Sequence, residues 1–324
     1  MPRTTYDRAL GAIWGVCVGD ALGGPVQFSN PGTFKPITDL EFVRPFKQPS
    51  GSYSDDGAMT LALAQSFVDS DGYYNHAMSI RYYLDWFNFG RFSTTDQAWD
   101  LGRSTRVALR QWRKRGALRD PNTTQMLVNE ELDREEASGN GSLMRISPLG
   151  VALWESPVQA KKLAREQSMV THPSLACLDA CEAYTELVCM AMSGCSKEGL
   201  GQAIGQFQFQ HPALISRFGQ YTSVQDWRAK SRVDMTSSGW VVDTLEVALW
   251  ALFKYDSWEA GALAVVNLGG DSDTAGAVYG GLAGIVYGFE SMPERWVKGM
   301  QNGRFVREVA EAFADSVQSK SRPI

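Results

Sequence analysis

The sequence predicts an all-α protein organised as a single domain. Apolar residues recur at helical spacing through most of the chain, whereas the alternating runs typical of strands are scarce. No linker, internal repeat, heptad array or low-complexity segment divides the 324 residues, of which 44% are hydrophobic. A chain of this length and composition can bury a large core, so one domain over residues 1–324 is the simplest organisation.

The first third of the chain is expected to contain helices separated by one long loop. Thr4 or Thr5 caps a first helix, which is expected to end in the small residues of 19–25. Prolines and glycines interrupt residues 30–52, so this segment is expected to be an irregular loop of the kind that can cover a site as a lid. The other helices are expected from Ser54, over about 75–89 and over about 95–115, followed by polar surface over 119–136.

Helices are also expected through the rest of the chain. They are placed near 143–153, 157–168, 174–193, 197–207, 240–253, 258–266, 275–289 and 304–319. Residues 207–238 are polar and broken and receive no assignment, and 262–267 is the one segment where a buried strand is an alternative. Glycines that recur every four residues predict a smooth stripe against which another helix packs closely. They are Gly276, Gly280, Gly284 and Gly288.

The charge distribution argues against nucleic acid as a partner. The formal net charge is −5, and basic residues are not gathered over any long stretch. The densest basic run, residues 110–119, interleaves Trp112 with arginine and lysine. We interpret this run as the solvated end of a helix, with contact to a phosphate as the alternative.

The cysteines and the apolar segments indicate a reduced compartment. Five cysteines include no Cys-x-x-Cys pair, and only three histidines are present, so a zinc site is not expected. The N-terminus lacks the apolar core of a signal peptide, and the most apolar late segment, 275–289, is shorter than a bilayer span. We therefore expect a cytoplasmic protein with no membrane partner.

Two acidic clusters carry the functional hypothesis. They are Asp271, Asp273 and Thr274 near the C-terminus, and Ser54, Asp55 and Asp56 near the N-terminus. Each cluster immediately precedes an apolar helix. A helix cap accounts for one aspartate of a pair, but the second is an adjacent like charge that capping does not require. We expect the two clusters to meet in space and to bind divalent metal.

The residue types indicate which metal would bind. Four carboxylates and two hydroxyls, without histidine or cysteine, form a hard oxygen-only ligand set that favours magnesium, manganese or calcium over zinc or copper. Four carboxylates balance the charge of two divalent ions. Burying them together without a cation would be strongly unfavourable or would keep several of them protonated.

Three further features are candidates on weaker grounds. The Gly-Asn-Gly turn at 139–141 leads through Ser142 into an apolar segment, and the free backbone N–H groups of such a turn suit a phosphate. A simple turn followed by a helix cap is an equal alternative. His172 beside a cap bonds either a ligand or the backbone. Asp100 is either a satisfied hydrogen-bond partner among core-like neighbours or part of a site.

Five short motifs occur in the order seen in the ADP-ribosylglycohydrolase family, which the chain resembles over about residues 6–290. They are Gly-Asp-Ala-Leu-Gly at 19–23, Ser-Asp-Asp at 54–56, Gly-Asn-Gly-Ser-Leu-Met-Arg at 139–145, the helix from Ser238 to Leu249, and Gly-Gly-Asp-Ser-Asp-Thr at 269–274. The loop at 139–145 and Trp-Asp-Leu-Gly at 99–102 look most like the bacterial branch that reactivates dinitrogenase reductase.

The resemblance implies a fold, a cofactor and a set of site residues. The implied fold is a compact orthogonal helical domain with a binuclear magnesium or manganese centre in a cleft. The implied metal ligands are Ser54, Asp55, Asp56, Asp271, Asp273 and Thr274. The implied substrate-binding residues are Asp20, Gln27, Gly139, Asn140, Gly141, Ser142, Met144 and His172, and the implied catalytic residues are Asp56, Asp100 and Asp271.

The reaction that the resemblance implies is hydrolysis of the glycosidic bond at C1″ of ADP-ribose, attached to a protein side chain or a small molecule. In members similar to the bacterial branch, the acid equivalent to Asp100 handles the arginine guanidinium. A carboxylate suits this role because a guanidine leaves best when it is protonated and held by an anion. ADP-ribosyl-arginine on a protein is therefore the favoured substrate.

Two residues depart from the family pattern and keep other hypotheses open. Gln27 stands where members commonly carry glutamate, and Gly57 stands where threonine or serine usually follows the aspartate pair. A non-catalytic ADP-ribose-binding protein on the same scaffold is therefore an alternative. An unrelated phosphohydrolase is a third hypothesis, because an apolar run precedes residues 271–274, but it requires a parallel sheet.

Overall fold

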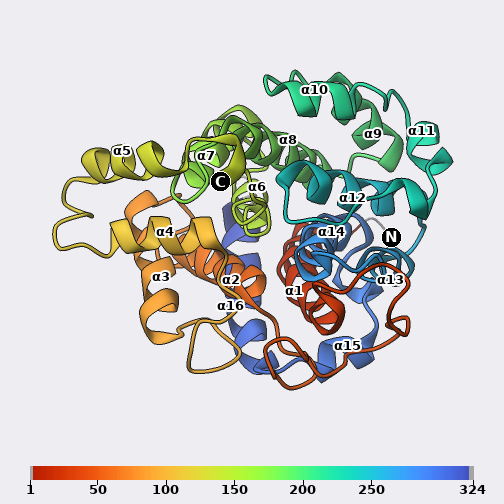
Figure 1. The fold of residues 1–324 in the computed structure, drawn as a ribbon, viewed down its shortest axis with the longest axis horizontal. Coiled ribbons are helices and arrows are strands. Elements are labelled where there is room, and N and C mark those ends of the chain that lie inside the picture. The colour runs from red at the N-terminus through yellow and green to blue at the C-terminus, as the bar shows by residue number, and fades with distance from the viewer. Residues whose placement is uncertain (1–2, 321–324) are drawn as a thin grey trace.

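The protein is built from helices and the loops between them (Figure 1). The computed structural model describes residues 3–320. In the first half of the chain the α-helices are α1 (Thr5–Gly23), α2 (Asp55–Val68), α3 (His76–Phe89), α4 (Arg103–Trp112), α5 (Pro121–Leu132), α6 (Ser147–Ala152) and α7 (Pro157–Met169). In the second half they are α8 (Leu175–Met192), α9 (Lys197–Gln206), α10 (Pro212–Phe218), α11 (Val224–Ala229), α12 (Val241–Lys254), α13 (Trp258–Val266), α14 (Ser272–Tyr287), α15 (Glu294–Gly299) and α16 (Gly303–Lys320).

The all-α prediction is confirmed. Within residues 3–320, β-structure is limited to two isolated bridges, Val43 with Gln48 and Gly139 with Trp240. The strand alternative at 262–267 is wrong, because most of these residues belong to α13 and bury their apolar side chains at helical spacing. A phosphohydrolase built on a parallel sheet is therefore excluded for the part of the chain that the structure describes.

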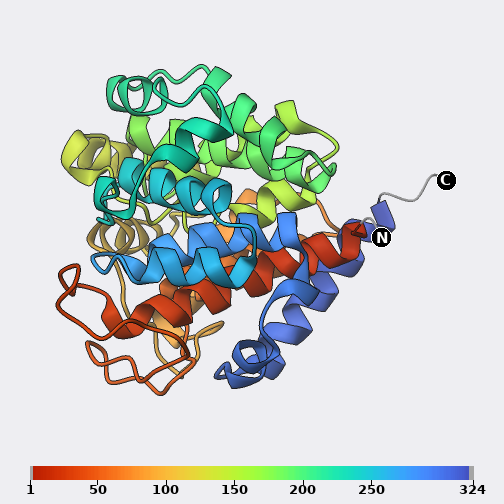
Figure 2. The same ribbon diagram turned by 90° about the vertical axis from the view of Figure 1, so that its right-hand side faces the viewer.

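Helices α1 and α14 run antiparallel through the middle of the molecule and pack backbone against backbone (Figure 2). A Cβ atom added at Gly15 would lie 2.0 Å from the carbonyl oxygen of Gly280, and one added at Gly19 would lie 2.1 Å from that of Gly276. The predicted glycine stripe on α14 therefore meets a second glycine stripe on α1. This packing brings the C-terminal end of α1 against the start of α14.

The first helix is longer than expected. Thr4 caps it as predicted, but the small residues of 19–23 belong to α1 rather than to a loop. Because these residues are small, α1 can approach α14 closely, and this packing keeps them helical. The stretch Thr5–Val26 is long and apolar enough to cross a membrane by length and composition, and the apolar window within it is fully buried as a core helix would be.

One other expectation is corrected. The helix expected over 95–115 begins only at Arg103, because Asp100 has a left-handed backbone with φ 55°, which an α-helix cannot contain. Residues 119–136 are polar surface as expected, and they form α5, which starts from an Asp120 cap followed by Pro121. Helices also occur in the unassigned segment 207–238, whereas residues 30–52 form the expected irregular loop apart from one bridge.

Candidate active site

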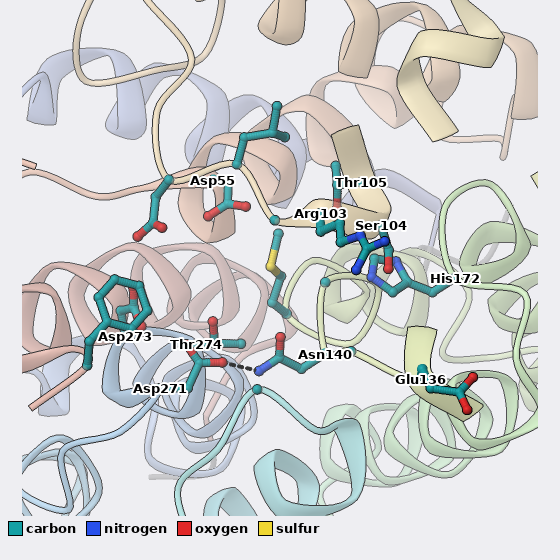
Figure 3. A pocket seen from close by; sticks show the side chains of 18 residues that line it. Asp55, Arg103, Ser104, Thr105, Glu136, Asn140, His172, Asp271, Asp273 and Thr274 are labelled. Carbon is teal, nitrogen blue, oxygen red and sulfur yellow. Dashed lines mark hydrogen bonds between the residues drawn. The ribbon is translucent and has the colours of Figure 1, made fainter. Parts of the chain in front are cut away.

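A cleft of about 400 Å³ opens where several connecting segments meet (Figure 3). Its walls come from the start of α2, the start of α4, the loop before α6 and the start of α14. The lining residues are Phe28, Asp55, Asp100, Leu101, Gly102, Arg103, Ser104, Thr105, Glu136, Gly139, Asn140, Gly141, Met144, His172, Gly239, Asp271, Asp273 and Thr274. Aspartates gather at one end, whereas Arg103, His172 and Glu136 lie at the other (Figure 3).

The two acidic clusters meet at one end of the cleft, as the sequence predicts. Asp56 lies in the first turn of α2 and Asp273 in the first turn of α14. Asp20 joins them from the C-terminal part of α1. One carboxylate oxygen from each of these three residues lies within 4.8 Å of the other two. Asp20, which the sequence analysis groups with substrate binding, therefore lies within the carboxylate cluster.

Asp20 fixes the start of α2. Its Oδ2 accepts hydrogen bonds from the backbone N–H of Ser54 at 2.8 Å and of Gly57 at 2.9 Å. The Ser54 side chain caps the helix by accepting from the N–H of Asp56. A Cβ atom at Gly57 would lie 2.7 Å from the ring of Tyr53. The glycine that departs from the family pattern is thus explained by the tyrosine packed against it.

Burial dominates the electrostatics of this end of the cleft. Burial raises the pKa of Asp20 to about 7 and that of Asp100 to about 6. Burial also raises the pKa of Asp271. For Asp55, Asp56 and Asp273, burial and the neighbouring carboxylates together raise the pKa well above its usual value. A cluster of this kind holds protons unless a cation replaces them.

Several buried polar atoms in this region have no hydrogen-bond partner among residues 3–320. They are Oδ1 of Asp56, Oδ1 of Asp273, Oδ2 of Asp100 and Nε2 of Gln27. A buried carboxylate oxygen without a donor is strongly disfavoured, and a bound cation satisfies it. The oxygen-only donor set and the two unpartnered aspartate oxygens fit magnesium or manganese.

Asp100 is held in a strained position on the cleft wall. Its φ of 55° lies in the left-handed region, which non-glycine residues rarely adopt. The Gln27 and Asp273 side chains lie close enough to lower the pKa of Asp100, against the larger rise caused by burial. Next to it, the ring of Trp99 lies 5.4 Å from that of Phe46, centroid to centroid. The packed Trp99 anchors the chain directly before Asp100, and Asp100 itself lines the cleft.

The loop before α6 ties the two halves of the site together. The Asn140 side chain donates hydrogen bonds to Asp271 Oδ2 at 2.5 Å and to Thr244 Oγ1 at 2.9 Å. The backbone N–H of Asn140 donates to the carbonyl oxygen of Gly239 at 3.1 Å. A Cβ atom at Gly141 would lie 2.7 Å from Cε1 of His172. Glycine is therefore required at 141, and the loop backbone is left open towards the cleft.

A buried arginine lies beneath this loop. Arg145 is fully buried, forms no ion pair within the described part of the chain, and donates to the carbonyl oxygen of Gly141 at 2.8 Å and to Thr171 Oγ1 at 2.8 Å. Thr171 Oγ1 in turn lies 2.8 Å from Nδ1 of His172. Burial and the charge of Arg145 lower the pKa of His172 to about 3, so the imidazole is neutral.

These contacts favour one tautomer of His172. Thr171 Oγ1 accepts from Arg145, so its own proton is free to point at Nδ1 of His172. In the tautomer in which Thr171 donates this hydrogen bond, the neutral imidazole carries its proton on Nε2. His172 lines the cleft beside Gly139 and Gly141. This wall therefore combines open backbone, an N–H donor and a positive charge beneath, which together suit an anionic group such as a diphosphate.

The comparison with known families identifies the fold and the chemistry. A family model described as ADP-ribosylglycohydrolase matches residues 1–323. The chain belongs to the ADP-ribosylglycohydrolase family. The predicted enzyme class, a hydrolase of ADP-ribosyl glycosidic bonds, is confirmed by this membership.

Individual relatives agree over nearly the whole chain. It is 31% identical to the ADP-ribosylarginine hydrolase Tri1 of Pseudomonas putida (strain GB-1), over 97% of this chain and 80% of that protein. It is 26% identical to the ADP-ribosyl-dinitrogen reductase glycohydrolase of Rhodospirillum rubrum, over 96% of both chains. A solved structure of an ADP-ribosylglycohydrolase-related protein complex matches with a TM-score of 0.77 and 30% identity, covering 97% of this chain and 99% of that one.

Most of the family-implied residues line the cleft, and a few lie behind it. The residues that are not on its surface are Asp20, Gln27, Ser54, Asp56 and Ser142. Asp20, Gln27, Ser54 and Asp56 are buried behind the aspartates at one end of the cleft. The hydroxyl of Ser142 instead faces the core, where it accepts a hydrogen bond from Ser168 Oγ at 2.7 Å. Any contact of Ser142 with a ligand would therefore involve its backbone.

The sequence analysis missed part of the cleft wall. The residues are Phe28, Leu101, Gly102, Arg103, Ser104, Thr105, Glu136 and Gly239. Because a helix was expected from residue 95, residues 103–105 were placed inside that helix rather than at its start. The Gly102 that precedes α4 was the available signal, since glycine is tolerated at a helix N-cap.

Proposed function

We propose that this protein removes ADP-ribose from the arginine side chain of a modified protein, using two divalent cations, in the cytoplasm. The single observation that carries the arginine assignment is Asp100, a half-buried residue on the cleft wall whose Oδ2 is buried and has no partner within residues 3–320. The relatives named for arginine-linked ADP-ribose support the same substrate. The five free cysteines suit a reducing compartment.

The cation ligands proposed for this chain are those implied by the family motif, backed by Asp20. They are Ser54, Asp55, Asp56, Asp271, Asp273 and Thr274. Magnesium or manganese would polarise the ribose and the attacking water when bound there. The unpartnered oxygens of Asp56 and Asp273 and the raised pKa values of the cluster support cation binding.

The other side chains would hold the substrate across the cleft. The open loop at 139–141 and Nε2–H of His172 would bind the diphosphate, with the charge of Arg145 beneath adding attraction. In the reaction, the bond from C1″ to the guanidine nitrogen breaks and the water oxygen joins C1″ as a hydroxyl. The other water proton goes to the departing nitrogen, so the arginine side chain leaves as guanidinium. Asp100 would accept hydrogen bonds from that guanidinium and stabilise the charge as it departs.

Gln27 limits the chemistry that this site can perform. Its amide cannot accept a proton, so a mechanism that depends on a glutamate base at this position is not available to the chain. The amide Nε2 is buried, has no partner within residues 3–320, and lies near Asp100. The Gln27 amide would therefore favour the charged form of Asp100, which suits the arginine-linked substrate.

The test is release of free ADP-ribose from matched peptides that carry arginine-linked or serine-linked ADP-ribose. Each is incubated with magnesium, with manganese and with EDTA. We expect metal-dependent release from the arginine-linked peptide alone. Release from the serine-linked peptide would show that Gln27 is no barrier and that the linkage is wrong. Release that persists in EDTA would contradict the proposed requirement for divalent cations. Binding of ADP-ribose without any release would contradict turnover of these substrates.

A further inference from the structure

A strongly basic helix face begins at the cleft mouth and is not used by the proposed reaction. Residues 103–119 contain seven arginines and lysines and no acidic residue, although the whole chain has a net charge of −5. The cations are Arg103, Arg106, Arg110, Arg113, Lys114, Arg115 and Arg119. All seven are exposed. This segment comprises α4 and the turn after it (Figure 1).

None of these seven cations forms an ion pair with another residue in the range 3–320. The nearby Glu131 of α5 instead accepts a hydrogen bond from Gln111. The exposed arginines of α16 behave differently, since Arg304 pairs with Glu308 and Arg307 with Glu311. A face that serves only for solubility usually mixes both signs of charge. The unmixed charge of α4 therefore points to a partner of the opposite sign.

The spacing aligns these charges with the cleft. Arg103 lines the cleft, and Arg106, Arg110 and Arg113 follow at intervals of three or four residues, which places them along one side of the helix. At 1.5 Å per residue, the row extends about 15 Å from the cleft mouth. A substrate protein whose modified side chain enters the cleft would rest its neighbouring surface on this row.

The start of α4 is unusual for a helix without an anionic partner. Gly102 provides no side-chain cap, and the first turn carries no acidic residue but begins with Arg103. A positive side chain at a helix N-terminus opposes the helix dipole, so its own helix gains nothing from it. Thr105 in the same turn is buried, lines the cleft, and its hydroxyl has no partner among residues 3–320. Charge and open hydroxyl thus both face an incoming ligand.

We propose that the basic face of α4, formed by Arg106, Arg110 and Arg113 and continued by Lys114 and Arg115, docks an acidic surface that flanks the ADP-ribosylated arginine of the substrate protein. This inference rests on the proposed function, because it names which modified proteins the same cleft receives. Complementary charge of this kind raises the encounter rate and selects partners, and it is weakened by salt.

The test compares peptides of equal length with one central ADP-ribosyl-arginine and flanks of glutamate, serine or lysine. Arg106→Glu combined with Arg110→Glu reverses the charge at two of the five positions of the face without touching a residue that lines the cleft. Lys298→Glu combined with Arg304→Glu is the control, since both are exposed, lie on α15 and α16, and produce the same change in net charge. Free ADP-ribosyl-L-arginine, which has no flanks, reports the chemistry alone.

The parent and the control should cleave the glutamate-flanked peptide with a kcat/KM about tenfold above that of the lysine-flanked peptide at low salt. The α4 variant should lose or invert this preference while its kcat/KM for free ADP-ribosyl-L-arginine stays unchanged. About 1 M sodium chloride should remove most of the preference in the parent, because the screening length falls to about 3 Å. If the parent and the α4 variant showed the same preference in kcat/KM for the glutamate-flanked over the lysine-flanked peptide, the proposal would be overturned.

Two further measurements separate the remaining outcomes. Fluorescence anisotropy with unmodified peptides measures docking without catalysis, so a loss of glutamate-peptide binding in the α4 variant would support the surface even if no substrate is cleaved. Failure to cleave free ADP-ribosyl-L-arginine would count against the proposed function alone. A labelled single-stranded oligonucleotide that binds the parent but not the α4 variant, without any peptide preference, would assign the face to nucleic acid and overturn the proposal.

Discussion

Gly15 and Gly280 face each other so closely that a Cβ atom on either would lie 2.0 Å from the carbonyl oxygen of the other. No side chain separates the two backbones at this crossing. The contact holds the acidic end of α1, with Asp20, beside the start of α14, with Asp273. The geometry of the carboxylate cluster therefore depends on how tightly two glycine stripes fit.

Replacing Gly280 by alanine should destabilise the protein by about 2 kcal/mol or more, because the added methyl group must push two backbones apart. The loss should outweigh the gain of about 1 kcal/mol in helix propensity. Chemical denaturation measures it. Gly303→Ala is the matched control, since a Cβ atom there meets its nearest neighbour at an ordinary 3.6 Å. Equal stabilities of the two variants would show that α1 and α14 separate at little cost.

Replacing Asp273 by asparagine should abolish ADP-ribose release and the stabilisation that magnesium provides. The parent should gain about 2.7 kcal/mol at a magnesium concentration one hundred times the dissociation constant. In EDTA the variant should be at least as stable as the parent, because burial and neighbouring carboxylates raise the pKa of Asp273 and disfavour its charge. Thermal unfolding with magnesium and with EDTA tests both statements. If magnesium stabilises the variant as much as the parent, Asp273 is not a metal ligand.

Without metal, stability should fall as the pH rises from about 4 to about 7. The pKa of Asp20 is raised from 3.8 to about 7, so in this window the folded state keeps a proton that the unfolded state has released. Each such proton changes the free energy of unfolding by about 1.4 kcal/mol per pH unit. Urea unfolding in EDTA at several pH values measures the slope, which Asp20→Asn should flatten. A rise in stability from pH 5 to pH 7 would contradict the assignment.

Replacing Asp100 by asparagine should lower kcat for arginine-linked ADP-ribose by about 100-fold or more, because the departing guanidinium loses its anionic partner. Binding of ADP-ribose should change little, since the diphosphate wall around Gly141 and His172 is untouched. Initial rates and isothermal titration with ADP-ribose separate the two effects. An unchanged kcat would mean that Asp100 has a structural role only.

The sequence was sufficient to predict the helices whose apolar residues repeat at 3.6-residue spacing, and the two acidic clusters. It was not sufficient where tertiary contacts overrode local preference. The small residues at 19–23 suggest a loop in isolation, and only the facing α14 makes them helical. The left-handed turn at Asp100 is a backbone property that no side-chain pattern reveals, and it hid the start of α4 and therefore Arg103.

The pairing of α1 with α14 also has a consequence for how the protein is made. The Ser272 hydroxyl donates to the carbonyl oxygen of Gly23, a residue 249 positions earlier in the chain. At a synthesis rate of about 5–20 residues per second, the glycine face of α1 waits about 10–50 s for its partner to be translated. During that interval an apolar helix of 19 residues is without the surface that buries it. The nascent chain should therefore need protection by chaperones until α14, in the last sixth of the chain, emerges, and no shorter nascent chain can have an assembled carboxylate cluster.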